Sequence, residues 1–172
     1  MKTLPLSHLV AQMENSARTI HSLVQGISDE RARWRPEPDR WSILEVVNHL
    51  WDEEIEDFRA HVEHVLERPK QPWPPIDPPR WVIERRYNER HLGQSIRGFM
   101  AARDESLAWL KTLDAPDWDA TAEAPFGPIR AGDVMASWAA HDLLHTRQLV
   151  RLHVQYTVQI VAPYGTRYAG EW

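Results

Sequence analysis

Cysteine is absent from the 172-residue sequence, which excludes disulfide bonds, thiolate metal ligands and a cysteine nucleophile. Histidine, aspartate and glutamate remain as the strong ligand types, so a metal site in this chain must be built from imidazole or carboxylate groups. Glycine is scarce at seven residues, and the 13 prolines are clustered. Few glycines and confined prolines are typical of long, uninterrupted helices joined by stiff connections.

Long hydrophobic runs are also missing. Polar residues occur throughout the first 20 positions, so the apolar run of a secretory signal peptide is missing. No segment reaches the roughly 20 apolar residues that a membrane span needs. We therefore expect a cytoplasmic protein with no membrane association. The formal charge of −5 argues against a nucleic-acid partner, because such proteins carry a basic surface. The mixed-sign run over 84–90 is typical of a solvated helix face.

Four segments have the apolar spacing of three and four residues that predicts amphipathic helices, over about 5–27, 43–68, 80–113 and 132–155. Ser42 and Glu45 form a capping-box pattern at the start of the second helix. The segment 68–80 contains six prolines and should cross between two halves of a bundle as stiff, extended chain. We predict an all-α fold, an antiparallel four-helix bundle that forms a single domain over residues 1–172.

The remaining segments are expected to be irregular. Residues 114–131 should form a loop, and residues 158–172 an irregular tail. The tail carries three aromatic residues, Tyr164, Tyr168 and Trp172, which we expect to pack back on the bundle.

Two histidines on the fourth predicted helix are spaced for a shared ion. His141 and His145 stand at i and i+4, so their imidazoles lie one above the other on the same face. That face also carries Val134, Trp138, Leu149 and Leu152, all within about 80° of His141 at 100° per residue. Buried imidazoles need partners for their nitrogens, and a shared metal or ordinary core hydrogen bonds would both supply them.

His49 is less clearly placed, because it lies away from the apolar arc of the second helix and shares its flank with acidic residues. Helical periodicity alone leaves a solvent-facing histidine as the simpler interpretation. The other six histidines (His8, His21, His61, His64, His91 and His153) are expected at surface or boundary positions.

Two stretches together resemble the DinB/YfiT-like family. The first is RWSILEVVNHL, from Arg40 to Leu50, and the second is DVMASWAAHDLLHTRQL, from Asp133 to Leu149. Their anchors are Trp-Ser-x6-His-Leu and His-x3-His-x2-Gln. The resemblance covers the whole helical layout and implies a four-helix bundle. It also implies that the metal ligands are His49, His141 and His145, with the ion at a cleft between helices.

Three imidazoles leave a divalent ion with at least one open position, which favours a reactive site. Zn²⁺ and Ni²⁺ both suit imidazole ligands. Such an ion could activate bound water for hydrolysis or hold a thiol for transfer to an electrophile. Members of the family resemble both metal-dependent hydrolases and transferases that use low-molecular-weight thiols such as bacillithiol or mycothiol. Glu53, one turn after His49, is a candidate proton acceptor, and Gln148, near His145, a candidate orienting group. A solvated glutamate and a core glutamine are the alternatives.

Two functions follow from this site. The first is a metal-dependent enzyme, a thiol S-transferase or hydrolase, that acts on a small electrophilic molecule. The second is a non-enzymatic, stress-related bundle in which the metal fixes helix packing or senses a ligand, and a fourth protein ligand that closes the site would favour it. Related bundles are often dimers, so a homodimer is left open.

Overall fold

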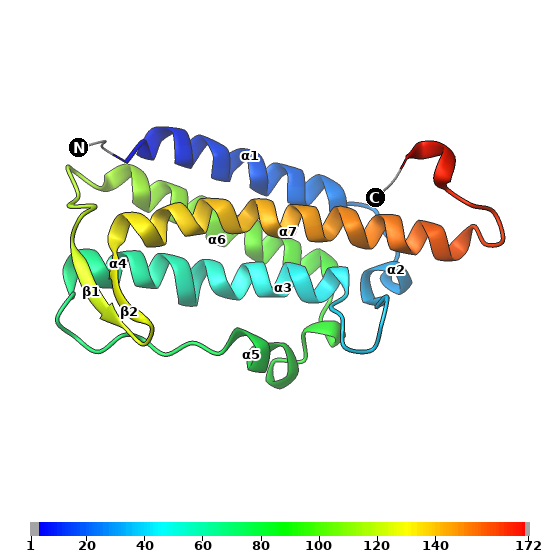
Figure 1. Ribbon diagram of the computed structural model, residues 1–172, viewed down its shortest axis with the longest axis horizontal. Coiled ribbons are helices and arrows are strands. Elements are labelled where there is room, and N and C mark those ends of the chain that lie inside the picture. The colour runs from blue at the N-terminus through cyan, green and yellow to red at the C-terminus, as the bar shows by residue number, and fades with distance from the viewer. Residues whose placement is uncertain (1–3, 171–172) are drawn as a thin grey trace.

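A computed structural model describes residues 4–170 and shows four long helical segments side by side (Figure 1). They are α1 (Leu6–Val24), a second segment made of three consecutive helices, α6 (Leu92–Thr112) and α7 (Ala131–Ile160). The second segment contains α3 (Ile43–Glu53), the π-helix η1 (Glu54–Arg59) and α4 (Ala60–Glu67). α3 packs against α6 and α7, and α1 packs against the same two helices. The predicted all-α four-helix bundle is confirmed.

The long connection over 68–91 determines the directions of the helices. Figure 1 shows that this segment returns along the length of the bundle, so that α6 runs in the same direction as α3 and opposite to α1 and α7. The chain over 72–77 is extended, but the last three residues of the predicted extended segment belong to α5 (Pro78–Glu84), which begins with two of the six prolines. The 3-10 helix η2 (Tyr87–Glu89) follows. The connection crosses between the two halves of the bundle, as the sequence predicted.

The third predicted helix begins twelve residues later than expected, at Leu92 rather than at about residue 80. Arg86 adopts a left-handed conformation with φ of 51°, which a continuous helix cannot contain. The Tyr87 ring is fully buried, and Arg85 donates a hydrogen bond of 2.7 Å to Asp52. The prediction of a solvated helix face over 84–90 is therefore wrong, because this run anchors the connection to α3.

The second predicted helix has the expected N-terminus and an unexpected interior. Ser42 and Glu45 form the predicted capping box, with the Ser42 side chain accepting a hydrogen bond from the Glu45 amide. The chain then widens into the π-helix η1, which begins at Glu54. A π-helix shifts the phase of the residues that follow it and is often found at functional sites.

Smaller elements complete the described chain. A short helix, α2 (Asp29–Arg33), lies between α1 and α3, and strands β1 (Thr121–Ala124) and β2 (Gly127–Arg130) form an antiparallel hairpin within the predicted loop. α7 extends past residue 155, and the tail after it contains the 3-10 helix η3 (Arg167–Ala169). Tyr164 and Tyr168 are 80% and 107% exposed, so the prediction that they pack on the bundle is wrong, and Trp172 lies outside the described residues.

The hydrophobic core is divided into two clusters by a layer of buried polar groups. One cluster includes Ile20, Val47, Phe99 and Leu149, and the other includes Met13, Val65, Leu107, Met135 and Trp138. Between them, each of the four helical segments contributes buried polar residues to the layer, namely Ser16, Asp52, Glu53, Glu54, Arg103, Ser106 and Asp142. Within residues 4–170, no helix is both long enough and apolar enough to cross a membrane.

Candidate metal centre

α7 presents His141 and His145 at the polar layer, between the two apolar clusters. Their Nε2 atoms lie 2.9 Å apart, as the i, i+4 spacing predicted. Val134, Trp138, Leu149 and Leu152, which share their stripe, are all buried. The apolar turns on either side therefore fix the orientation of this face towards α3.

α3 brings His49 to the same point. Its Nε2 atom lies 3.1 Å from Nε2 of His145, and the ring stands 4.8 Å from the Trp41 ring. His49 is only 5% exposed, so the solvent-facing interpretation is wrong. Periodicity did not predict the burial of His49, because residues on almost every side of α3 are buried. The other helices of the bundle cover one side of α3, and α5 and η2 of the 68–91 connection cover another.

The three histidines have the spacing that a single ion requires. One ring nitrogen from each of His49, His141 and His145 lies within 4.8 Å of the other two. Nitrogens bound to one zinc ion at about 2.0–2.1 Å are separated by about 2.8–3.4 Å for bond angles from 90° to tetrahedral. The two Nε2 separations of 2.9 and 3.1 Å lie within this range. The residues present therefore fit a divalent ion.

Burial keeps these imidazoles neutral, which is the form that binds metals. Removal from water, with a smaller contribution from the other two histidines, lowers the pKa of His49 to about 2. Removal from water, with smaller contributions from His145 and Arg103, lowers the pKa of His141 to about 3. The pKa of His145 is lowered for the same reason, although its hydrogen bond to Gln148 opposes the effect. No proton has to leave these rings near neutral pH before a cation binds.

Gln148 fixes the orientation of His145. Nδ1 of His145 lies 2.7 Å from Oε1 of Gln148, an oxygen that only accepts hydrogen bonds. Nδ1 therefore carries the ring proton, and the lone pair is on Nε2, directed at the other two histidines. Metal-binding histidines commonly have such a partner on the second nitrogen.

The Glu53 carboxylate lies beside the three histidines, and its side chain is 7% exposed. Its Oε2 atom is 3.1 Å from Nε2 of His141, and its Oε1 atom is 3.4 Å from Nδ1 of His49. The latter contact lacks the direction of a hydrogen bond, and Nδ1 of His49 has no hydrogen-bond partner within the described residues. Burial, with a smaller contribution from Asp57, raises the pKa of Glu53 to about 8. A bound cation would favour its ionised form.

A second buried cluster next to the histidines was not found from sequence. Arg103 of α6 bonds Glu54 at 2.7–2.8 Å and Asp142 at 2.6–2.9 Å, and all three side chains are about 1% exposed. Trp138 also donates a hydrogen bond of 2.9 Å to Glu54. Glu54 and Asp142 directly follow Glu53 and His141 in the chain. No local pattern signals this cluster, because its members come from separate helices.

Two other histidines are buried, contrary to expectation. His61 and His64 of α4 are 0% and 2% exposed, because the Pro-rich connection covers them. The Trp73 ring from that connection stacks on His61 at 4.2 Å. His153 is half-buried and bonds the Leu23 carbonyl at 2.7 Å.

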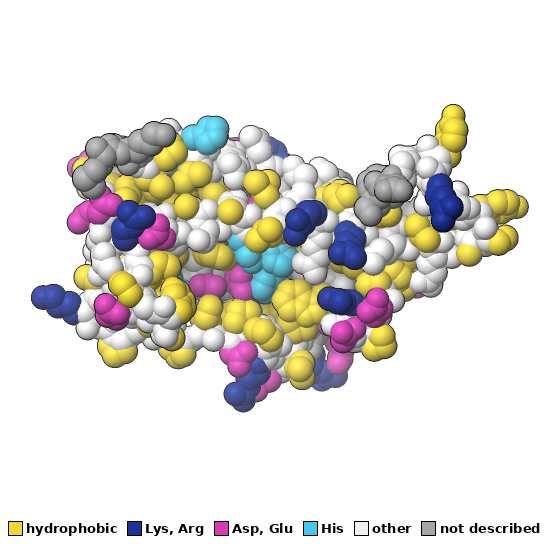
Figure 2. Space-filling view, in the orientation of Figure 1, with side chains coloured by type: hydrophobic (Ala, Val, Ile, Leu, Met, Phe, Trp, Pro, Cys, Tyr) yellow, Lys and Arg dark blue, Asp and Glu magenta, His cyan; other side chains and the backbone are white. Residues whose placement is uncertain are grey.

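The candidate site is open to solvent at one face. Figure 2 shows histidine side chains at the surface where α7 passes α3, with acidic side chains on one side of them and basic side chains on the other. The His141 side chain is 17% exposed, compared with 7% for Glu53. A small molecule can therefore reach the histidines from this face.

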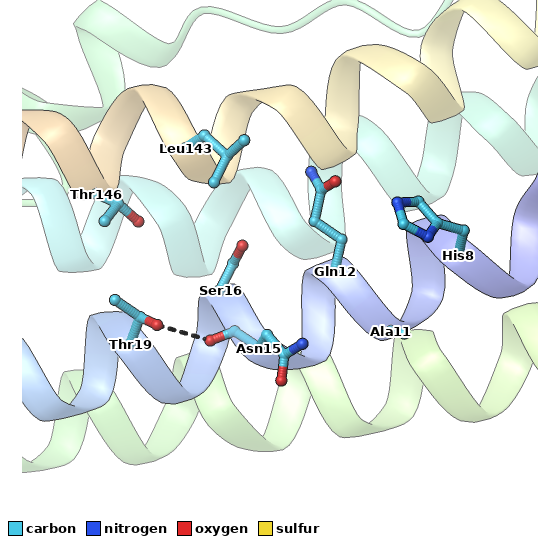
Figure 3. Close-up of a pocket in the computed structure, with 8 residues that line it drawn as sticks. All are labelled: His8, Ala11, Gln12, Asn15, Ser16, Thr19, Leu143 and Thr146. Carbon is cyan, nitrogen blue, oxygen red and sulfur yellow. Dashed lines mark hydrogen bonds between the residues drawn. The ribbon is translucent and has the colours of Figure 1, made fainter.

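A separate groove lies between α1 and α7 (Figure 3) and has a volume of about 380 Å³. Gln12, Ser16 and Leu143 are among the side chains that line it, and none of the three clustered histidines does. Gln12 donates a hydrogen bond of 3.1 Å to the Ala139 carbonyl. The groove contains no cluster of ligating groups, and we assign it no function.

Comparison with known proteins agrees with this fold. The sequence model of the DinB superfamily matches residues 12–149. A solved structure of YfiT from Bacillus subtilis, described as a probable metal-dependent hydrolase with an unusual four-helix bundle topology, superposes with a TM-score of 0.80. The two sequences are 14% identical, and the match covers 91% of this chain and 90% of the YfiT chain. No curated protein matches this chain in sequence.

Proposed function

The chain belongs to the DinB superfamily, and we propose that it binds one divalent metal ion through His49, His141 and His145 and uses this ion to catalyse a reaction of a small electrophile. The observation that carries the proposal is the convergence of three neutral imidazoles on one point at the edge of the bundle. Three ligands leave at least one position of the ion for substrate or water, as in catalytic rather than structural sites.

When bound, such an ion supplies Lewis-acid chemistry, because it polarises an electrophilic group and lowers the pKa of a nucleophile. The surrounding residues would accept a proton, orient a ligand and cover the site. Glu53 is placed to accept the proton of the nucleophile, since its Oε2 atom is 3.1 Å from the His141 nitrogen that faces the site. Gln148 holds His145 in the required tautomer. The Phe58 ring packs 4.8 Å from the His141 ring and covers that side of the imidazole.

Hydrolysis is the reaction that we favour, because the structurally similar YfiT is described as a probable metal-dependent hydrolase. Thiol transfer is the second candidate, and it would need a low-molecular-weight thiol as co-substrate because the chain contains no cysteine. Zn²⁺ and Ni²⁺ are the ions to test first. A non-enzymatic metal-binding bundle is the alternative outcome if metal is present but neither reaction is observed.

Elemental analysis of protein purified after growth with Zn²⁺ and Ni²⁺ tests the metal assignment. We expect one ion per chain in the wild type, a loss of bound metal in His141→Ala, and no loss in His8→Ala, a control on an exposed residue of α1. Absence of metal from the wild type would refute the proposal. Activity assays of the loaded protein against ester and amide substrates, with and without added thiol, then distinguish hydrolysis from transfer.

A further inference from the structure

The cleft that leads away from the three histidines has a basic end. A cavity of about 180 Å³ lies between the segment before α3 and the adjacent flank of α7. Pro36, Glu37, Arg40 and Trp41 line it on one side, and Gln148, Arg151, Leu152 and Gln155 line it on the other. Trp41 contacts the His49 ring and Gln148 bonds His145, so the cavity adjoins the candidate metal centre directly.

The arginines of this cavity have little to neutralise them. Within residues 4–170, Arg151 forms no ion pair. Arg147 also forms none in this part of the chain, and it lines a second, larger groove along α7 together with His145. Arg40 has one carboxylate neighbour, Glu37, at 3.7 Å between Nε and Oε2. Both side chains of that pair are about two-thirds exposed, and exposed pairs at such distances contribute little.

The positions of the arginines and of the apolar side chains along this cavity indicate what kind of ligand would fit it. Arg151 lies six residues beyond His145 on α7, which is an axial distance of about 9 Å. The Trp41 ring and Leu152 provide apolar wall in between. Guanidinium groups bind carboxylate and phosphate groups in a bidentate manner and with high selectivity for planar or tetrahedral oxyanions.

From these observations we infer that the substrate is a small organic anion, whose carboxylate or phosphate group binds Arg40 and Arg151 while its reactive end lies at the three histidines. This inference rests on the proposed function only in placing the reactive end of the anion at the three histidines. The bound ion adds positive charge at the other end of the cleft, so both ends favour an anion over a neutral molecule of the same shape. Glu37 at the rim releases Arg40 when the anion binds.

Binding of simple probes to the zinc-loaded protein tests the inference. Calorimetric titrations with succinate, methyl phosphate and the neutral analogue succinamide are compared for the wild type, the double variant Arg40→Gln/Arg151→Gln, and Arg97→Gln. Arg97 is an exposed arginine of α6 that does not line the cavity, so this control removes one positive charge outside the cleft. Zinc content and the urea unfolding midpoint are measured on every sample, which separates loss of metal or of folding from loss of anion binding.

We expect at least one anion to bind the wild type about tenfold more tightly than succinamide, and the double variant to lose about tenfold or more of that affinity. Arg97→Gln should bind as the wild type does. Tighter binding of succinate than of methyl phosphate identifies a carboxylate ligand, and the reverse order a phosphate ligand. Equal binding of succinamide, or unchanged affinity in the double variant with full zinc occupancy, would overturn the inference and leave the metal site intact. A wild type that binds no zinc refutes the proposed function, whereas arginine-dependent anion binding to that metal-free chain would still support the inference.

Discussion

Arg103 and Asp142 form a buried ion pair through two hydrogen bonds of 2.6 and 2.9 Å, with both side chains about 1% exposed. Asp142 directly follows His141, and the other partner of Arg103, Glu54, directly follows Glu53. Arg103 therefore anchors the turn of α7 that carries His141. It also anchors the start of η1, which directly follows Glu53.

Replacement of Arg103 should destabilise the protein strongly. Arg103→Met leaves Glu54 and Asp142 as buried carboxylates without a cation, which costs about 3–5 kcal/mol of the free energy of unfolding. Arg97→Met, at an exposed position of the same helix, should cost less than about 0.5 kcal/mol. Urea unfolding monitored by circular dichroism measures both. A loss below 1 kcal/mol in Arg103→Met would show that the two carboxylates find other partners.

Loss of the Gln148 side-chain oxygen should weaken metal binding without removing a ligand. Gln148→Leu leaves Nδ1 of His145 without its acceptor, so the ring is no longer held in the tautomer that directs Nε2 to the ion. We expect metal affinity to fall by about 10- to 100-fold, measured by competition with a chelating dye. Gln155→Leu, on the same flank of α7, is the control and should leave affinity unchanged. Equal affinities for both variants would argue against an orienting role for Gln148.

Gly98 should be intolerant of alanine, although it lies within a helix. A Cβ atom at Gly98 would stand 2.4–2.6 Å from three atoms of the Trp51 ring, because α6 and α3 approach closely there. Gly98→Ala should therefore destabilise by about 1–3 kcal/mol, the usual cost of overpacking. Gly93→Ala, whose Cβ has no neighbour closer than 3.4 Å, should be neutral or stabilise by up to about 1 kcal/mol through helix propensity. Thermal unfolding of both variants checks the prediction, and a stabilised Gly98→Ala would contradict it.

His61 should stabilise the protein more at low pH than at high pH. Its Nδ1 lies 2.7 Å from a carboxylate oxygen of Asp57 and its Nε2 lies 3.0 Å from the Pro74 carbonyl, so both nitrogens donate when the ring is charged. Burial lowers the pKa of His61, but the bonds to Asp57 and Pro74 outweigh it and raise the pKa overall. A raised pKa in the folded state means that this stabilisation is complete below the unfolded value of about 6.5 and is lost as the pH rises through the folded value.

The comparison of wild type with His61→Gln by urea unfolding at pH 6 and pH 9 tests this. The difference in the free energy of unfolding should be about 1.5–3 kcal/mol at pH 6, as for hydrogen bonds of charged groups, and clearly smaller at pH 9. His8→Gln, at an exposed position, should show no difference at either pH. A difference for His61→Gln that is constant with pH would mean that the ring is neutral throughout.

The sequence by itself determined the features that arise from short-range periodicity. The i, i+4 spacing of His141 and His145, the apolar stripe around them and the Ser42–Glu45 capping box all depend on residues within a few turns of one helix. The four prolines between residues 69 and 75 excluded a helix there for a local steric reason, whereas Pro78 and Pro79 stand at the first positions of α5, where a missing amide is tolerated. Residue order was therefore sufficient for the bundle and for two of the three clustered histidines.

Only the tertiary structure decided the position of His49, because the burial of one face of α3 depends on which segments cover it. The same holds for the Arg103 cluster, whose members lie 39 and 49 residues apart along the chain and carry no common spacing. It also holds for His61, which the stacked Trp73 ring of the returning connection covers. Contacts between distant segments reflect the packing of whole helices, and local periodicity contains no information about that packing.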